Sequence, residues 1–307
     1  RRGLATRHAR VAVVTNIAND HLGEYGIMTL ADLAQAKFAV ARALLPDGIL
    51  VLNADDSNIV DATAHVSKRI CWFSLDAKSP QITQAQMLGQ PCAYLQDDVL
   101  VYWTGTEDAW EIPLKDVPIT LSGAAKHNMR NALAAICACS ALGIGAETIQ
   151  KGLSAFVSDQ QNNPGRFNEF SYNGARVIVD FAHNAHSVAA VCDATAQIPA
   201  KRRFLMLSQP GDHSDHAIGE VTTNALEFRP DLIVTAEIAD HLRGRLLGET
   251  TGVIRASAVA AGFSGDNIMA ASSPSVGTKI ILDKLKPDDL ALLLVLSDRD
   301  AVFQSLA

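Results

Sequence analysis

The sequence has few of the features that mark secreted, membrane-spanning or nucleic-acid-binding proteins. Its five cysteines are odd in number and lack metal-ligand spacing, so we expect buried thiols in a reducing cytoplasm. The longest apolar run, residues 290–296, has the length of a strand rather than of a membrane-spanning helix, and no signal-peptide pattern is present. No basic run interleaved with aromatic residues occurs, which argues against nucleic acid as a main partner.

The chain contains enough apolar material for two cores. Its 307 residues and hydrophobic content of 48% predict about two domains.

In residues 1–45 the run Val11–Val14 is apolar and β-branched and therefore predicts a buried strand. Polar residues 15–21 follow, where a parallel sheet presents ligands at its carboxyl edge. Thr29 then opens a helix, with Asp32 as a weaker form of the capping box. The apolar stripe of this helix is expected to contain Leu30, Leu33, Lys37, Val40, Ala41 and Leu44.

Lys37 is out of place on an apolar helical face, because a buried ammonium is costly without a partner. One interpretation is that its stem runs along the apolar face while its charged end stays in water. The other is that Lys37 and the pair Asp20-His21 together face a metal ion or a phosphate.

Further strand ends in the first half carry polar groups. A turn at 46–48 precedes a predicted buried strand, Ile49–Leu52, which ends in Asn53–Asp56. These acidic residues either face a ligand or cap the next helix from Asp56. Residues 69–121 hold all three tryptophans and predict a small antiparallel β insert. Its expected strands are 70–73, 93–95, 99–103, 110–114 and 119–121.

An alanine-rich helix is expected from about residue 122 to Leu142. Asn128 and Asn131 share one of its faces, where two amides suit a purine edge, which needs donors and acceptors together. Helix capping is the alternative that asparagine also favours. A second helix near 146–157 and a linker at 159–165 complete this half.

The second half alternates strands and helices, which predicts a doubly wound parallel sheet. No G-x-G-x-x-G follows its first strand, so the dinucleotide fingerprint is absent. Polar groups again follow the strands: Asp180, His183 and Asn184 after the first, and Gln209 to His213 after the second. The expected strands are 175–181, 203–208, 231–236, 267–271 and 289–296, with helices near 185–197, 215–228, 250–262 and 274–285.

The motifs, taken in order, resemble those of the Mur ligase superfamily. They are Val14–Ile17 with Asp20-His21, Lys37, Asn53–Asp56, His127-Asn128 with Asn131, Pro164–Arg166 and Val179–Asn184. The resemblance implies an α/β protein with a partial, P-loop NTPase-like central domain over residues 1–160. This domain would carry the insert at about 69–121 and be followed by a Rossmann-like C-terminal domain over 161–307. Within the superfamily the sequence most resembles the cyanophycin-synthetase family. The segments that carry this resemblance are Arg1–Leu4, His21–Gly26, Pro210–Asp212 and His241–Arg245.

The resemblance implies an ATP-dependent amide ligase that also uses magnesium. ATP would phosphorylate a carboxylate, and an amine would displace phosphate. In the cyanophycin-synthetase family this half joins arginine to the side chains of poly-aspartate, and a separate ATP-grasp half adds the aspartates. A homo-oligomer is also expected.

Residue by residue, the resemblance implies two groups of site residues. His21 is similar to a ligand of the second magnesium, and Lys37 to a lysine whose carbamate helps to hold that ion. The nucleotide contacts implied are Asn128 and Asn131 for adenine, Arg166 for phosphate and Asp180 for ribose. His183 is similar to a catalytic position near the nucleotide.

The sequence also departs from the family pattern. It contains no Gly-rich loop ending in Gly-Lys-Ser/Thr, the loop that cradles phosphates. We expect this loop, a metal-binding glutamate and the ATP-grasp half to lie upstream, so that the 307 residues alone are inactive. His213 stands where arginine is expected, and residues 236–238 are less charged than in the family. Two alternatives therefore stand beside the ligase: a non-catalytic Mur-like binding module, and another Mur-superfamily ligase for cell-wall or folate chains.

Overall fold

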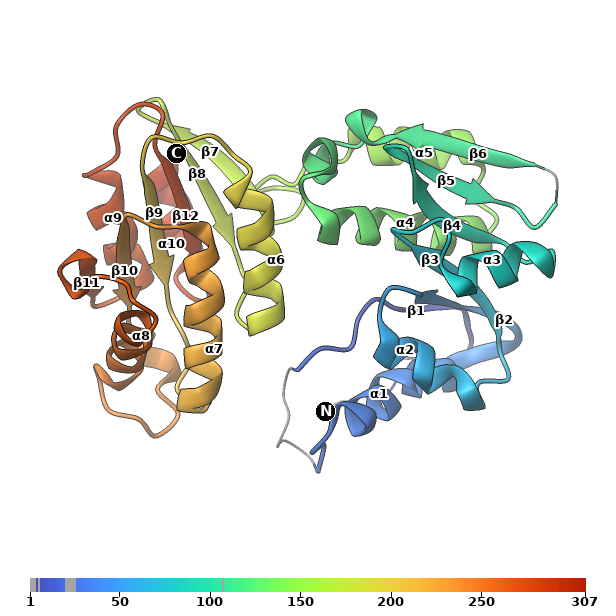
Figure 1. Cartoon of the computed structure of the whole chain (residues 1–307), viewed down its shortest axis with the longest axis horizontal. Helices are drawn as coiled ribbons and strands as arrows, with labels where there is room; N and C mark the ends of the chain where they lie inside the picture. Colours follow the sequence, from blue (N-terminus) through green and yellow to red (C-terminus); the bar gives the residue numbers. More distant parts are fainter. Residues whose placement is uncertain (1–3, 5, 20–25, 107) are drawn as a thin grey trace. The chain divides into compact units, whose positions relative to one another are not determined.

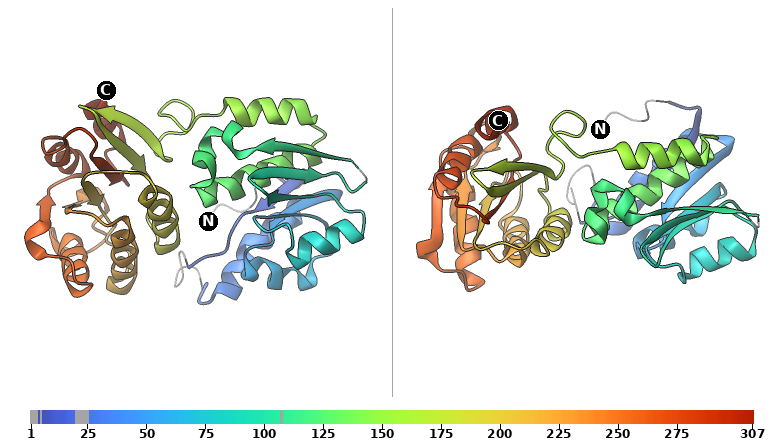
Figure 2. Two further views of the ribbon diagram at one scale, coloured as in Figure 1. Left: turned by 45° about the horizontal axis from the view of Figure 1, so that its top comes forward. Right: turned by 90° about the horizontal axis from the view of Figure 1, so that it is seen from above.

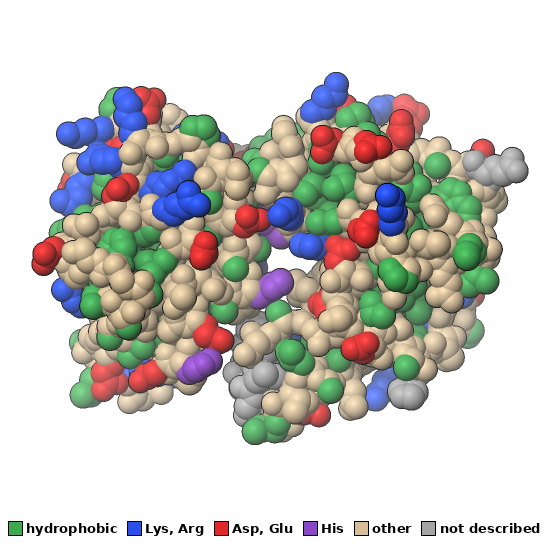
Figure 3. All heavy atoms as spheres, in the orientation of Figure 1, with side chains coloured by type: hydrophobic (Ala, Val, Ile, Leu, Met, Phe, Trp, Pro, Cys, Tyr) green, Lys and Arg blue, Asp and Glu red, His purple; other side chains and the backbone are tan. Residues whose placement is uncertain are grey.

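The computed structural model describes residues 4, 6–19, 26–106 and 108–307 (Figure 1). The chain divides into two compact units, Arg1–Phe156 and Val157–Ala307. Among the described residues, no helix is long and apolar enough to cross a membrane. Acidic and basic side chains both occur on each unit in the face drawn in Figure 3.

The first unit is a six-stranded sheet in the order β1-β2-β3-β4-β5-β6. The first four strands are parallel, whereas β5 and β6 are antiparallel to their neighbours. The strands are β1 (Ala9–Val14), β2 (Leu44–Asn53), β3 (Arg69–Ser74), β4 (Cys92–Gln96), β5 (Val99–Trp103) and β6 (Ala109–Pro113). The helices are α1 (Leu30–Phe38), α2 (Ser57–Ala62), α3 (Pro80–Met87), α4 (Lys126–Ala141) and α5 (Ala146–Ala155).

Alternation along β2 explains why this sheet is covered on both faces. Leu50 and Leu52 are fully buried in one cluster with residues of α1 and α2. Val51 points to the opposite face and belongs to a second cluster with Leu133 of α4 and other residues of that helix. Since successive strand side chains point to opposite faces, a wholly apolar strand needs a helix layer on each side. Figure 2 shows these two layers.

Four expectations for this unit are wrong, one of them only in part. The helix that starts at Leu30 does not reach Leu44, because a short 3-10 turn, Ala39–Ala43, leads directly into β2. The predicted turn at 46–48 lies within β2, where the register with β1 shifts. The antiparallel insert predicted at residues 69–121 is confirmed only from β4 onward: β5 and β6 are antiparallel at the edge of the sheet, whereas β3 and β4 extend its parallel part. Residues 119–121 lie in a 3-10 turn, Pro118–Gly123, rather than in a strand.

The turn Pro118–Gly123 is held by hydrogen bonds to the residues just before it instead of pairing with the sheet. The Thr120 hydroxyl donates to the carbonyls of Leu114 and Val117, and Leu121 and Ser122 adopt left-handed backbone angles.

Helix α3 was not expected either, although Ser79 accepts from the backbone N–H of Ile82 as its N-cap. Local hydrogen bonds of this kind outweigh the β propensity of a short apolar run.

The second unit confirms the predicted α/β class with a largely parallel sheet. Its strand order is β11-β10-β9-β12-β8-β7, and β7 alone of these strands is antiparallel to its neighbour. The strands are β7 (Asn168–Tyr172), β8 (Ala175–Asp180), β9 (Arg203–Leu207), β10 (Leu232–Ala236), β11 (Ile268–Ala271) and β12 (Leu290–Leu294). The helices are α6 (Ala185–Ala196), α7 (Asp215–Ala225), α8 (Glu249–Ala260), α9 (Pro274–Leu282) and α10 (Arg299–Leu306).

The helices of this unit lie on both faces of the sheet, as a doubly wound fold requires. Helices α6, α7 and α8 pack side by side on one face, whereas α9 and α10 pack together on the other (Figure 1). Val179, Met206 and Leu293 belong to the buried cluster that includes Ile281 of α9 and Phe303 of α10. Because β12 returns between β8 and β9, the carboxyl ends of these three strands form the point where the strand order reverses. Ligands of open α/β sheets bind at such a point.

Candidate functional site

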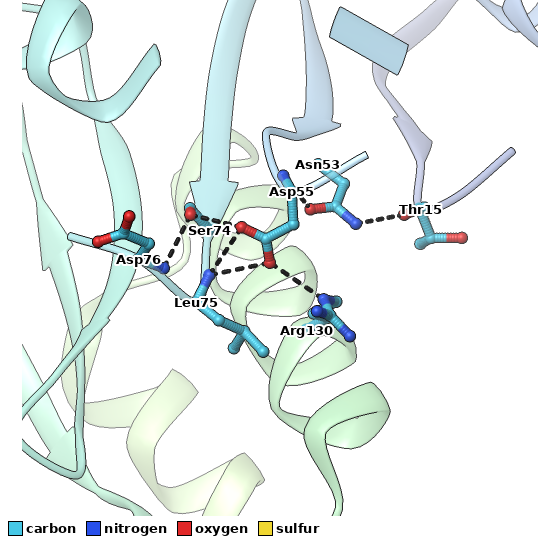
Figure 4. Close-up of polar contacts among 7 residues, drawn as sticks. All are labelled: Thr15, Asn53, Asp55, Ser74, Leu75, Asp76 and Arg130. Carbon is cyan, nitrogen blue, oxygen red and sulfur yellow. Dashed lines mark hydrogen bonds and ion pairs between the residues drawn. The ribbon is translucent and has the colours of Figure 1, made fainter. Parts of the chain in front are cut away.

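The segment that follows β1 is held in place by side chains from the end of β2 and from α2. The Asn53 amide donates to the Thr15 carbonyl at 2.9 Å (Figure 4). The backbone N–H of Ile17 donates to Asp56 at 2.6 Å, and the Asn58 amide donates to the Ile17 carbonyl at 3.1 Å. Asp56 is also the N-cap of α2. The capping alternative for Asp56 is therefore confirmed, and the same carboxylate fixes the start of the loop after β1.

Asp55 is occupied by protein donors in the described structure. Its carboxylate accepts from the Ser74 hydroxyl at 2.6 Å, from the backbone N–H of Leu75 at 3.0 Å and from Arg130 Nε at 3.0 Å (Figure 4). The Ser74 hydroxyl oxygen in turn accepts from the backbone N–H of Asp76. Asp55 thus joins the ends of β2 and β3 to helix α4. This network spans 75 residues of sequence, and nothing in the sequence alone pairs Asp55 with Arg130.

Lys37 lies in the last turn of α1 and is partly buried. Its ammonium nitrogen lies 3.2 Å from the carbonyl oxygen of Asn16, to which it donates. The side chain therefore points toward the loop after β1, rather than only running along an apolar face. A carbamate nitrogen keeps one N–H, so this contact is compatible with either form of Lys37.

The expected metal ligand His21, and Asp20 beside it, lie outside the described residues. In the part of the chain that the structure describes, no group of three or more His, Cys, Asp or Glu side chains could hold a metal ion. The carboxylates of Asp55 and Asp56 are both engaged by protein N–H and O–H groups. The described residues therefore do not form a magnesium site by themselves.

The structure brings Asn128 and Asn131 together on α4. The Asn131 amide donates to Asn128 Oδ1 at 3.4 Å, and the Asn128 amide donates to the carbonyl of Ile119 at 2.9 Å. The N-cap of α4 is Ala125, without a side-chain hydrogen bond. The capping alternative for these asparagines is therefore wrong. Asn131 is exposed and offers its remaining amide groups to solvent.

In the second unit, Asp180 ends β8 as a buried carboxylate with 6% exposure. It accepts from the backbone N–H groups of Phe167 at 2.8 Å and Ala182 at 2.7 Å. Burial raises the pKa of Asp180, while these hydrogen bonds and the charge of Arg166 act in the opposite direction. Asp180 therefore ties the entry of β7 to the loop after β8.

Arg166 and His183 both contact the ring of Phe181. The Arg166 guanidinium lies 5.2 Å from the centre of the Phe181 ring, and the His183 ring meets that ring edge-on at 5.4 Å. His183 Nδ1 lies 3.2 Å from the Phe181 carbonyl oxygen. Because a carbonyl only accepts, this contact requires a proton on Nδ1 and leaves Nε2 as the acceptor of a neutral ring. A cavity of about 520 Å³ adjoins Phe181 and is lined further by residues 295–301.

Gly211 and Arg245 are bonded to each other, and no pattern in the sequence pairs them. Arg245 donates Nε–H to the Gly211 carbonyl at 2.9 Å and Nη2–H to the His213 carbonyl at 2.6 Å. Its Nη1 forms an ion pair with Asp215. The buried Glu237 accepts from the backbone N–H of Gly248. The Arg245 contacts hold the loops after β9 and β10 together, whereas the Glu237 contact lies within the loop after β10.

Two family models match the chain in sequence order. The Mur ligase middle domain matches residues 2–139, and the Mur ligase, glutamate ligase domain matches residues 165–294. The chain belongs to the Mur ligase family.

Among curated proteins the chain is similar to cyanophycin synthetases. It is 32% identical to the cyanophycin synthetase of Synechocystis over 258 residues, which cover 83% of this chain and 29% of that protein. It is 31% identical to the cyanophycin synthetase of Nostoc over 254 residues, which cover 83% of this chain and 28% of that protein. The chain thus spans less than a third of the length of these relatives.

The fold is similar to solved structures of Mur-type ligases. For MurF from Acinetobacter baumannii the TM-score is 0.66 at 19% identity, covering 97% of this chain and 59% of that one. For Escherichia coli FolC, solved in complex with DHPP and ADP, the TM-score is 0.64 at 18% identity. The match covers 97% of this chain and 61% of FolC.

Proposed function

We propose that this chain is the Mur-type part of an ATP-dependent ligase that joins an amino acid, arginine, to aspartate side chains of a poly-aspartate polymer. The observation that carries the proposal is the 31–32% identity to cyanophycin synthetases over 83% of the chain. The family to which the chain belongs contains ligases that make amide bonds to amino acids, such as UDP-N-acetylmuramate–L-alanine ligase.

The proposed reaction proceeds through an acyl phosphate. ATP donates its γ-phosphoryl group to the aspartate carboxylate, which yields the acyl phosphate and ADP. The amine of the incoming amino acid attacks the acyl carbon, the bond from this carbon to the phosphate oxygen breaks, and the amine loses a proton. The products are an amide and inorganic phosphate. Holding the two reactants in line is the main task of the protein in such a reaction.

In the first unit we propose that Asn128 and Asn131 contact adenine. The exposed amide of Asn131 offers both a donor and an acceptor, which the edge of adenine requires. On the phosphate side, we propose that Lys37 is carbamylated. Lys37 and His21 are then both ligands of magnesium. The Lys37 nitrogen lies 3.2 Å from the carbonyl oxygen of Asn16, which stands five residues before His21 in the sequence, and this contact supports the proposal.

In the second unit we propose that Arg166 contacts phosphate and that Asp180 accepts from ribose hydroxyls. Arg166 is exposed, and its guanidinium suits a phosphate oxygen. A carboxylate has about four lone-pair sites, which the backbone donors to Asp180 leave partly available. His183 would act near the nucleotide through Nε2, since Nδ1 faces the Phe181 carbonyl.

A non-catalytic Mur-like module is the second candidate. It is favoured by one observation, the absence of a loop ending in Gly-Lys-Ser/Thr from the 307 residues. Without the backbone cradle of such a loop, triphosphate binding loses its main contacts.

The test is phosphate release by the longer ligase that contains these residues, with ATP, arginine and a poly-aspartate primer. Release that requires both arginine and primer supports the proposal. Release with a different amino acid would indicate another Mur-superfamily ligase. If no phosphate is released in any combination while the primer still binds, the non-catalytic module is the better description.

A further inference from the structure

Asn128 and Asn131 lie in the first two turns of α4, and the start of this helix has no side-chain cap. The backbone carbonyl of the N-cap residue, Ala125, accepts from the N–H groups of Asn128 and Met129, but its methyl side chain cannot accept from a further amide. A missing cap costs a helix about 1 kcal/mol and lets its first turn fray. The position of this turn therefore depends on contacts with other elements.

Arg130 provides such a contact from the beginning of the second turn. It lies between the two asparagines, and its Nε–H donates to Asp55 Oδ2 at 3.0 Å (Figure 4). The side chain of Arg130 is 38% exposed and that of Asp55 is 15% exposed, so the pair is only partly screened by solvent.

Asp55 is a rigid anchor for this contact because it is fixed from two sides. The Ser74 hydroxyl and the backbone N–H of Leu75 hold its carboxylate at the end of β3. Two residues earlier, Asn53 accepts from the Asp55 backbone N–H and donates to the Thr15 carbonyl. The same short segment therefore sets both the loop after β1 and the start of α4.

We propose that Arg130 is a positioning residue for adenine recognition. Joined to Asp55, it sets the rotation of the first two turns of α4 and thereby the direction of the Asn128–Asn131 face. This inference rests on the proposed function, in which that face contacts adenine.

A role in stability alone does not account for this arrangement. Helix α4 is already anchored by its buried residues Met129, Leu133 and Ile136. When Arg130 is removed, Asp55 keeps its bonds to Ser74 and Leu75, so no buried carboxylate is left without donors. Loss of the contact should loosen the first two turns and leave the rest of the helix in place.

The first experiment is amide hydrogen exchange on the 307-residue chain. Arg130→Gln should exchange at least threefold faster than wild type over residues 127–131, with unchanged exchange over 133–140. The control is Arg69→Gln, which removes one positive charge from an exposed residue at the start of β3. Equal exchange in Arg130→Gln and Arg69→Gln would overturn the proposal.

The second experiment measures the ligase that contains this chain, with ATP and with GTP. Arg130→Gln should raise KM for ATP about three- to tenfold with kcat nearly unchanged, and should narrow the preference for ATP over GTP. A positioning role predicts this split between KM and kcat, whereas a purely structural role lowers the amount of active enzyme and kcat alone. Arg130→Lys keeps the charge and should recover part of the loss.

Asn131→Ala distinguishes failure of the proposed adenine site from failure of the positioning role of Arg130. If Asn131→Ala leaves KM for ATP and the nucleotide preference unchanged, the proposed adenine site itself is wrong. If Asn131→Ala raises KM for ATP while Arg130→Gln does not, the adenine site stands and the positioning role is overturned. Combining Asp55→Asn with Arg130→Gln should add little beyond the larger single effect, because both variants break the same contact.

Discussion

Arg245 donates its Nε–H to the carbonyl oxygen of Gly211 at 2.9 Å. In return, the backbone N–H of Gly211 donates to the carbonyl of His241 at 2.8 Å. Two loops that are 34 residues apart in sequence thus exchange hydrogen bonds at the carboxyl edge of the second sheet. This close approach of the backbones explains why a glycine stands at position 211.

Gly211→Ala should destabilise the second unit. A Cβ at this position would lie 1.9 Å from the carbonyl oxygen of Leu242, so the two loops would have to separate. We expect a loss of about 1–3 kcal/mol in the free energy of unfolding, measured by chemical denaturation. Gly252→Ala in α8 is the matched control, since a Cβ there meets no atom within 4 Å and should be neutral or stabilising. Equal stability of the two variants would contradict the packing argument.

The pair Arg202 and Asp289 should make stability depend on acidic pH. Burial acts to raise the pKa of Asp289, but hydrogen bonds from Arg202 and from the backbone N–H of Lys286 lower it overall. A carboxylate with a lowered pKa in the folded state adds stability above its unfolded pKa of about 3.9 and loses it as the pH falls through the folded pKa.

Arg202→Gln should therefore cost about 1 kcal/mol at pH 7, a figure reduced because Arg202 is partly exposed. The difference from wild type should shrink below about pH 4. Denaturation curves at several pH values provide the measurement. Lys201→Gln removes an exposed ion pair with Asp288 and serves as the control, with little expected change. A difference that persists undiminished into acid would count against Asp289 as the source.

Asp180→Ala should raise the apparent KM of the ligase for ATP more than it lowers kcat, because a ribose contact contributes binding rather than chemistry. The substitution also leaves the backbone N–H groups of Phe167 and Ala182 without their acceptor. Thermal denaturation must therefore accompany the kinetics, and Asp180→Asn keeps one acceptor oxygen as a milder variant. A normal KM with a collapsed kcat in a folded variant would argue against the ribose role.

Lys37→Ala distinguishes a structural lysine from a carbamylated one. If Lys37 only donates to the Asn16 carbonyl, its loss should change stability by no more than about 0.5 kcal/mol and leave ligation intact. If it is carbamylated, ligation in the longer enzyme should be abolished with the fold unchanged, and acetate should restore part of the activity. Activity with and without acetate is measured, with circular dichroism as the folding control. Wild-type activity in Lys37→Ala would exclude the carbamate.

The 307-residue chain by itself should not bind ATP tightly. It contains no loop ending in Gly-Lys-Ser/Thr, so the triphosphate has no backbone cradle within these residues. Calorimetric titration with ATP and magnesium is expected to show no micromolar binding. Micromolar affinity would show that other residues replace the cradle.

The candidate site could be predicted only in part from the sequence. Asn128 and Asn131 were expected on one face because residues three apart on a helix are neighbours, and their side chains do meet. The acidic residues after β2 were expected at the sheet edge, where they do lie. The sequence could not show that Asp55 and Asp56 are engaged by Arg130 and the backbone of Ile17. Those partners are distant in the chain, and no periodic pattern relates them.

The sequence by itself determined the α/β class, the alternation of strands and helices in the second half, and the polar residues at the strand ends. These features depend on local hydrophobic periodicity, which short stretches of sequence display. Only the tertiary structure decided that β3 and β4 extend a parallel sheet, that Arg130 bonds to Asp55, and that Arg245 joins two loops. Strand order and side-chain pairing depend on contacts between residues far apart in sequence, and these exist only once the chain has folded.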